Sequence, residues 1–79
     1  MKIISSDSFA YTAKGDIKSY TVELIETDGT FSVKVTFSST QSGFWNGTAL
    51  KVQGVTKAAA QKVYDECVAE RLGKGYVRA

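Results

Sequence analysis

The sequence predicts a small α+β domain in which an antiparallel β-sheet of three to five strands is covered on one face by one C-terminal α-helix. Residues 18–39 alternate apolar and polar side chains on both sides of Asp28-Gly29, as the two strands of a β-hairpin do. Residues 56–78 contain the one long segment whose apolar residues recur at helical spacing. A sheet with one apolar face needs such a helix to cover it.

The turn of this hairpin fixes its register. Asp28-Gly29 is a strong signal for a two-residue type I′ turn, because Asp and Gly tolerate positive φ. The turn places Glu23 opposite Lys34, and a slip of one residue would break every match. Ile25 falls on the polar face, where we expect the N-terminal segment to cover it. The apolar pairs in this register are Leu24–Val33, Val22–Val35 and Tyr20–Phe37.

The N-terminal segment is predicted as two short strands. Residues 2–5 and 9–12 each have the length of a short strand, and residues 6–8, Ser-Asp-Ser, have turn chemistry. Residues 14–16, Lys-Gly-Asp, are typical of a turn that leads into the hairpin.

A further strand is predicted after the hairpin. Residues 48–53 alternate, with Leu50 and Val52 on one face. Residues 40–47 before it have the composition of a loop, and residues 76–77 could add a short extended segment beside the sheet.

The helix has recognisable ends. Thr56 is a good N-cap, since its hydroxyl can accept a hydrogen bond from a first-turn amide, and Gly73 is predicted to end the helix in a left-handed conformation. The solvent face carries Lys62, Asp65 and Glu66, with Lys62 and Glu66 spaced for an i,i+4 contact. The apolar face is formed by Ala60, Val63, Tyr64, Cys67, Val68 and Leu72.

Length and composition predict one cytoplasmic domain that spans residues 1–79. The single cysteine, Cys67, excludes an intrachain disulfide, which in a short chain favours a reducing compartment. No signal-peptide pattern opens the chain, and no apolar run approaches the ~18–20 residues of a membrane span, so we expect no membrane partner. A core this small rarely supplies more than ~3–5 kcal/mol, so a protein partner or a dimer interface could add stability.

Catalysis is poorly supported by the residue types present. The chain has no histidine, which removes the usual base near pH 7 and the commonest metal ligand. Cys67 lies on the apolar helix face, where a thiol is normally packing, and no glycine-rich phosphate loop is present. We therefore expect no enzyme activity, no cofactor and no metal.

Two adjacent aromatic residues, Phe44 and Trp45, are the most distinctive candidates for binding. They lie in the loop between Gly43 and Gly47, and an exposed Trp anchors partners or stacks on a base. The alternative is that Trp45 folds back and closes one end of the core. Uncompensated positive charge would complete a nucleic-acid site, although the C-terminal cations could instead complement the helix terminus. The candidate cations are Lys51, Arg71, Lys74 and Arg78.

The C-terminal third is similar to the end of a WGR domain. The matching strings are Ala-Gln-Lys-Val-Tyr-Asp-Glu at 60–66, Val-Ala-Glu-Arg-Leu at 68–72 and Gly-Lys-Gly-Tyr-Val at 73–77, and the hairpin precedes them in the family's order. WGR domains occur in poly(ADP-ribose) polymerases and in assorted bacterial proteins, and we expect this chain to be a bacterial one. The resemblance implies a sheet crossed by one helix, with contacts to DNA ends and neighbouring domains.

The Trp-Gly-Arg motif that names the family is absent. At its position, after the second hairpin strand, the chain has Phe37, Ser38 and Ser39. Phe37 can supply an aromatic ring, but Ser39 cannot supply the guanidinium that would bind phosphate. The resemblance therefore predicts the fold more directly than it predicts a DNA contact.

Two kinds of function follow. The sequence favours a non-enzymatic, WGR-like accessory or interaction module that binds a protein, with weak nucleic-acid association in addition. The alternative is a genuine DNA-binding domain, either of WGR type or of the β-β-β-α type found in phage integrases and AP2-type factors. The second type reads the major groove with its sheet, and one Lys and one Glu on the polar face of the hairpin, Lys34 and Glu23, make a poor groove reader.

Overall fold

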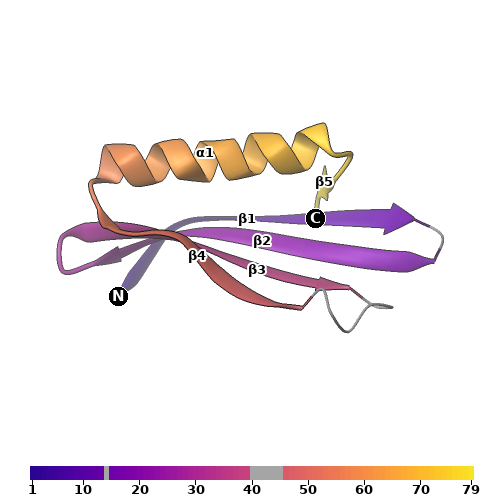
Figure 1. The fold of residues 1–79 in the computed structure, drawn as a ribbon, viewed down its shortest axis with the longest axis horizontal. Coiled ribbons are helices and arrows are strands. Elements are labelled where there is room, and N and C mark those ends of the chain that lie inside the picture. Colours follow the sequence, from indigo (N-terminus) through magenta and orange to yellow (C-terminus); the bar gives the residue numbers. More distant parts are fainter. Residues whose placement is uncertain (14, 40–45) are drawn as a thin grey trace.

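The computed structural model, which describes residues 1–13, 15–39 and 46–79, confirms the predicted α+β fold (Figure 1). The described strands form one sheet in the order β4-β3-β2-β1-β5, and neighbouring strands are antiparallel. The helix lies lengthwise over one face of this sheet. The elements are β1 (Lys2–Ala13), β2 (Asp16–Thr27), β3 (Thr30–Ser39), β4 (Gly47–Val55), α1 (Lys57–Gly73) and β5 (Val77–Arg78).

The β2–β3 hairpin has the predicted turn and register. Asp28 and Gly29 have φ values of 51° and 83°, as a type I′ turn requires at both central positions. Glu23 pairs with Lys34 on the face that α1 leaves uncovered. The apolar pairs are those predicted: Leu24 with Val33, Val22 with Val35, and Tyr20 with Phe37.

The prediction of two N-terminal strands was wrong, because β1 is one continuous strand. Residues 6–8 pair in succession with Glu23, Val22 and Thr21 of β2, so sheet pairing overrides their turn propensity. This strand also accounts for Ile25, which is only 7% exposed and pairs with Ile3. The N-terminal segment therefore covers Ile25, as the sequence predicted.

The predicted facing of Leu50 and Val52 was also wrong. The β3–β4 ladder changes register between Val33 and Lys34, so that Val52 pairs with Val33 and Leu50 pairs with Lys34. Because Val33 and Lys34 point to opposite faces, Val52 packs against the core while Leu50 is 52% exposed. A register irregularity of this kind leaves no clear trace in an alternating sequence.

The helix begins after Thr56 and ends at Gly73, as predicted, but the left-handed residue is a different glycine. The Thr56 hydroxyl accepts a hydrogen bond from the amide of Ala59 at 3.3 Å. The helix continues through Gly73 because the Lys74 amide still bonds to helical carbonyls, and the left-handed residue is Gly75, with φ 92°. Leu72, predicted on the apolar face, is 44% exposed, since Arg71 turns toward the sheet in the last turn instead.

The core lies between α1 and the covered face of the sheet. From the helix, Ala60, Tyr64 and Cys67 are buried, whereas Val63 and Val68 are half-buried. From the sheet, the buried side chains are Phe9, Tyr20, Val22, Leu24, Val33 and Val35. The helix among the described residues is not long and apolar enough to cross a membrane.

Leu24 tests this core directly, because its side chain is fully buried. Replacing Leu24 with Ala should lower the free energy of unfolding by about 2–5 kcal/mol through lost burial and a residual cavity. Leu50→Ala removes the same atoms from an exposed position and should change it by no more than about 0.5 kcal/mol. Urea unfolding followed by circular dichroism measures both, and equal losses would contradict the observed facing of the two residues.

Candidate functional site

A groove of about 300 Å³ lies where the last turn of α1 passes over the sheet. Its walls come from β1, from β2, from the end of the helix and from the segment that follows it. The lining residues are Tyr11, Lys18, Arg71, Lys74 and Tyr76. The groove thus combines cationic side chains with phenol rings, which is the chemistry of an anion-binding surface.

Arg71 is the structural centre of the groove. Its guanidinium carbon is 4.3 Å from the ring centroid of Tyr20 and 5.2 Å from that of Tyr76. Its side chain is 13% exposed, and Nη2 donates to Glu70 Oε1 at 2.7 Å. Burial acts to lower the pKa of Arg71, but the hydrogen bond to Glu70 and the neighbouring Tyr20 raise it on balance. The guanidinium therefore stays charged between the two rings.

The two tyrosines of the groove form one wall. The rings of Tyr11 and Tyr76 stack with centroids 5.4 Å apart and planes inclined by 29°. Gly75 turns the chain into this position, and a Cβ there would lie 3.4 Å from the Tyr11 ring. The Tyr76 amide donates to the Arg71 carbonyl at 3.1 Å, which ties the wall to the end of the helix.

Lys18 supplies a cation beside the position where the WGR motif would place its arginine. The β2–β3 register pairs Lys18 with Ser39, and Ser39 Oγ donates to Asp16 Oδ1 at 2.7 Å. Phe37 is half-buried and packs against the core, while Ser38 is exposed. The motif position therefore provides packing and a hydroxyl, and the positive charge comes from the neighbouring strand.

Of the cations predicted from sequence, the groove contains Arg71 and Lys74. Lys74 Nζ is 3.6 Å from Glu70 Oε1, and Lys51 on β4 is close enough to act on the same carboxylate. The hydrogen bond from Arg71 and then the charge of Lys74 lower the pKa of Glu70. Glu70 therefore remains ionised at the rim and offsets part of the positive charge.

Arg78 lies apart from the groove. It forms an ion pair with Asp7 of β1, and its guanidinium carbon is 5.4 Å from the Phe9 ring centroid. The other carboxylate oxygen of Asp7 accepts a hydrogen bond of 2.5 Å from the Tyr64 hydroxyl. Burial, followed by this hydrogen bond, raises the pKa of Tyr64. Arg78 thus fastens β5 to β1 and α1.

The predicted aromatic pair, Phe44 and Trp45, lies outside the described residues.

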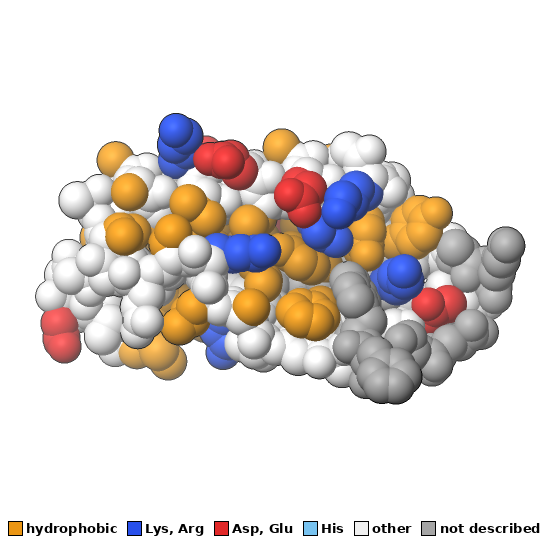
Figure 2. Space-filling model, viewed as in Figure 1, with side chains coloured by type: hydrophobic (Ala, Val, Ile, Leu, Met, Phe, Trp, Pro, Cys, Tyr) orange, Lys and Arg blue, Asp and Glu red, His pale blue; other side chains and the backbone are white. Residues whose placement is uncertain are grey.

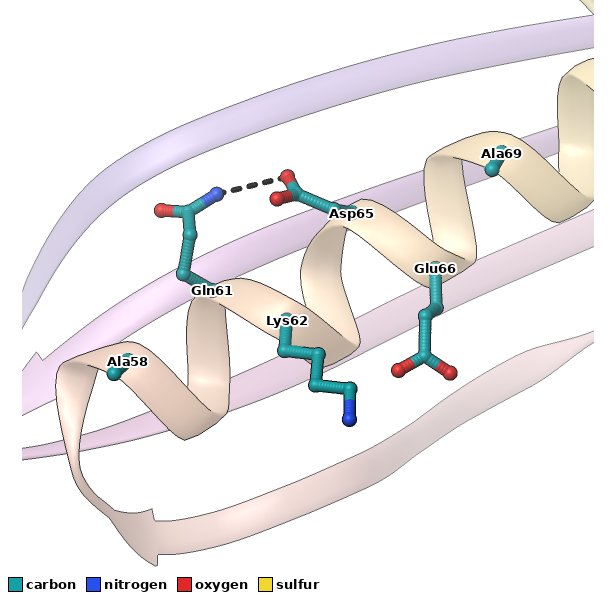
Figure 3. A pocket seen from close by; sticks show the side chains of 6 residues that line it. All are labelled: Ala58, Gln61, Lys62, Asp65, Glu66 and Ala69. Atoms are coloured by element: carbon teal, nitrogen blue, oxygen red, sulfur yellow. Dashed lines mark hydrogen bonds between the residues drawn. The ribbon is translucent and has the colours of Figure 1, made fainter.

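A larger depression, of about 710 Å³, lies on the outer side of α1 (Figure 3). All its lining residues come from that one helix, so it has no opposing wall. Gln61 Nε2 donates to Asp65 Oδ1 at 2.9 Å along one border of the depression, whereas Lys62 and Glu66 project together in the opposite direction. Without convergent groups from a second element it is a solvated helix surface, and the smaller groove is the stronger candidate.

Sequence reasoning missed three groove residues: Tyr11, Lys18 and Tyr76. Lys18 could have been found, because extending the predicted hairpin register pairs it with Ser39. The sequence predicted an extended segment at residues 76–77 beside the sheet, but it did not indicate that the turn at Gly75 brings Tyr76 against Tyr11. Figure 2 shows Lys and Arg side chains spread over this face of the molecule, and some of them lie beside acidic side chains toward the end where α1 ends.

Comparisons with known protein families, with curated proteins and with solved structures found no match. The WGR resemblance therefore rests on the sequence strings alone. Among the described residues, no group of three or more His, Cys, Asp and Glu side chains could hold a metal ion.

The buried environment of Tyr20 predicts a pH dependence of stability. Burial, followed by the neighbouring Cys67, raises the pKa of Tyr20 to about 12. In the unfolded chain a tyrosine ionises near about 10, so this group stabilises the fold fully below that pH. Its contribution is lost as pH rises from about 10 to about 12, because only the unfolded state releases the proton.

The free energy of unfolding should therefore fall less steeply over this range in Tyr20→Phe than in the parent protein. Urea unfolding at a series of pH values measures the slope. Thr36→Ala, on the exposed side of the sheet, should keep the parent slope. An unchanged slope in Tyr20→Phe would mean that Tyr20 ionises as readily in the fold as outside it.

Proposed function

We propose that this chain is a non-enzymatic, WGR-like binding module whose groove holds phosphate groups of a nucleic acid strand. The observation that supports it is the meeting of Lys18, Arg71 and Lys74 with two tyrosine rings in one concave surface. Cations neutralise phosphates, while ring faces stack on bases of any sequence. The chemistry suits a strand whose bases are accessible, such as a single strand or a frayed end.

The groove residues divide this work between them. Arg71 is largely buried and already bonded to Glu70, so it contributes positive potential and holds the rings in place. Lys74 is more exposed and can reach a phosphate as a mobile point charge. Lys18 adds a second ammonium from β2. Phenol hydroxyls can donate further hydrogen bonds to phosphate oxygens.

The small number of cations sets the expected strength of binding. Each phosphate neutralised on a single strand contributes about −0.7 to the slope of log affinity against log salt. Two ammonium groups then give a slope of about −1.4. Affinity should be weak and should depend only shallowly on salt, as expected for an accessory contact that works beside other domains.

A second candidate is binding to an acidic segment of a protein. Glu70 favours it, because this carboxylate contacts both Arg71 and Lys74 and leaves less charge for a polyanion. One or two carboxylates of a peptide would fit the remaining charge as well as phosphates do. Both proposed functions use the same groove, so they differ only in whether the bound ligand is a nucleic acid or an acidic peptide.

We propose a cytoplasmic setting for either ligand. Cys67, the one cysteine, is a free thiol on the buried face of α1. A short domain that is held together without a disulfide is typical of a reducing compartment.

The test is a fluorescence-anisotropy titration of labelled single-stranded oligonucleotide at low salt. Replacing both Lys18 and Lys74 with Ala should weaken binding about tenfold or more, which corresponds to about 1.4 kcal/mol. The double variant should also have a shallower salt slope. Lys62→Ala, on the outer side of α1, removes a lysine outside the groove and should leave binding unchanged.

Absence of oligonucleotide binding at low salt would contradict the nucleic-acid proposal, as would equal weakening by Lys62→Ala. Repeating the titration with an acidic peptide tests the second candidate. Peptide binding that requires Lys18 and Lys74, in a protein that does not bind oligonucleotide, would assign the groove to a protein partner.

A further inference from the structure

Along the N-terminal half of β1, no described strand pairs on the side away from β2. β5 pairs with β1 only at Phe9 and Ala10, beside the middle of the strand (Figure 1). The Ala79 amide also donates to the Ser8 carbonyl at 2.9 Å, so the contacts of this segment with β1 reach Ser8. Residues 2–7 lie along β2 on one side, where all but Ile4 have a partner, and no described strand pairs with them on the other. Such an edge presents unpaired backbone donors and acceptors.

The backbone groups that face outward along this edge follow from the ladder. The Ser8 carbonyl points toward β5, and directions alternate along an antiparallel strand, so the amide and carbonyl of Ser6 point outward as well. Ser5 pairs with Leu24 of β2, and after a register shift Ile3 pairs with Ile25, the next residue of β2. Because directions alternate between Leu24 and Ile25, they also alternate between Ser5, which faces β2, and Ile3. Ile3 therefore also points outward. Two outward-facing residues, Ile3 and Ser6, are available to a new strand.

The side chains at this edge include exposed apolar groups. Met1 is 94% exposed, Ile3 53% and Ile4 37%. A cluster of large apolar side chains at an unpaired edge is a surface that pairing would cover.

We propose that two copies of this chain pair through residues 2–7 of β1, antiparallel about a two-fold axis that passes between Ile4 and Ser5. In this register Ile3 of one copy lies opposite Ser6 of the other. The two residues both face outward, so they can exchange backbone hydrogen bonds on each side of the axis. The pairing stops at Asp7, because the Ser8 carbonyl already accepts a hydrogen bond from the Ala79 amide.

The charges along this edge of β1 match those of a second copy of the chain. Lys2 and Asp7 lie on the same face of the sheet, since they pair with Glu26 and Val22 of β2. The two-fold axis places Lys2 of each copy opposite Asp7 of the other, so the same base–acid pair forms twice. Asp7 already holds Arg78 and Tyr64, and its carboxylate is therefore fixed at the edge.

The opposite edge of the sheet does not offer the same match. β4 carries one charge, Lys51, and no acid that could pair with it in a second copy. The β3–β4 ladder also has two register shifts, which bend the strand. Such features protect an edge from pairing. The β1 edge, with both signs of charge and one register shift, is the self-complementary one.

The proposed dimer leaves the groove accessible. The groove is lined by Tyr11, near the far end of β1, whereas the pairing uses the strand's first residues. A dimer would therefore present two grooves, and simultaneous engagement would raise the avidity for a long ligand. This interface does not depend on what the groove binds.

Sedimentation equilibrium from about 1 µM to about 1 mM, the range in which weak complexes dissociate, tests the pairing. The parent chain should pass from monomer to dimer. Ser6→Pro removes an outward amide without touching the ladder to β2, so it should stay monomeric with unchanged circular dichroism. Ser6→Ala keeps the amide and should dimerise like the parent. A monomeric parent, or a Ser6→Pro variant that dimerises equally well, would overturn the proposal.

A charge variant tests the register even if Ser6→Pro fails to fold. Lys2→Glu places two acids opposite each other and should raise the dimer dissociation constant about tenfold or more, which corresponds to about 1.4 kcal/mol. Lys62→Glu makes the same charge change on the exposed side of α1 and should leave the constant unchanged. Equal effects of the two variants would refute the Lys2–Asp7 pairing.

Hydrogen exchange gives a direct readout in the unmodified chain. The amides of Ile3 and Ser6 should become protected as protein concentration rises, while amides in β4 should not. A monomeric chain in which these amides are protected only by an added extended peptide would assign the edge to another strand and would overturn the dimer.

Discussion

The groove, and the packing of the end of α1 on the sheet, depend on one interaction. The Arg71 guanidinium lies between the rings of Tyr20 and Tyr76. Tyr20 belongs to the sheet, Arg71 to the last turn of the helix and Tyr76 to the segment after it. Each cation–π contact of this kind is worth about 0.5–2 kcal/mol, a sizeable share of the stability of a small domain. Nε of Arg71 is buried without a hydrogen-bond partner among the described residues, so stacking and Glu70 hold the group.

This arrangement separates stability from binding. A buried cation is costly, and the hydrogen bond to Glu70 offsets part of that cost while it keeps Arg71 charged. The same carboxylate lies 3.6 Å from Lys74 and reduces the charge that the rim offers to a ligand. The result is a groove with a rigid aromatic wall and few available cations, which is suited to weak, sequence-tolerant contacts.

Local signals predicted the hairpin and the helix start, because a type I′ turn and a Thr N-cap act over a few residues. Local sequence signals failed to predict the structure where strand pairing determines it. Residues 6–8 have turn chemistry but pair with β2. In β4, a register shift places Leu50 and Val52 on opposite faces of the sheet. Only part of the groove could be predicted from the sequence. Lys18 follows from the hairpin register, whereas the Tyr11–Tyr76 stack is created by a chain reversal after the helix.

A double-mutant cycle between Tyr20 and Arg71 tests the central interaction most directly. The free energies of unfolding of Tyr20→Leu, Arg71→Met and the double variant isolate the coupling between the two side chains from the loss of apolar burial. The stacked geometry predicts a favourable coupling of about 0.5–2 kcal/mol. A coupling close to zero would show that the ring and the guanidinium contribute independently, and Arg71 would then not be what joins the helix end to the sheet.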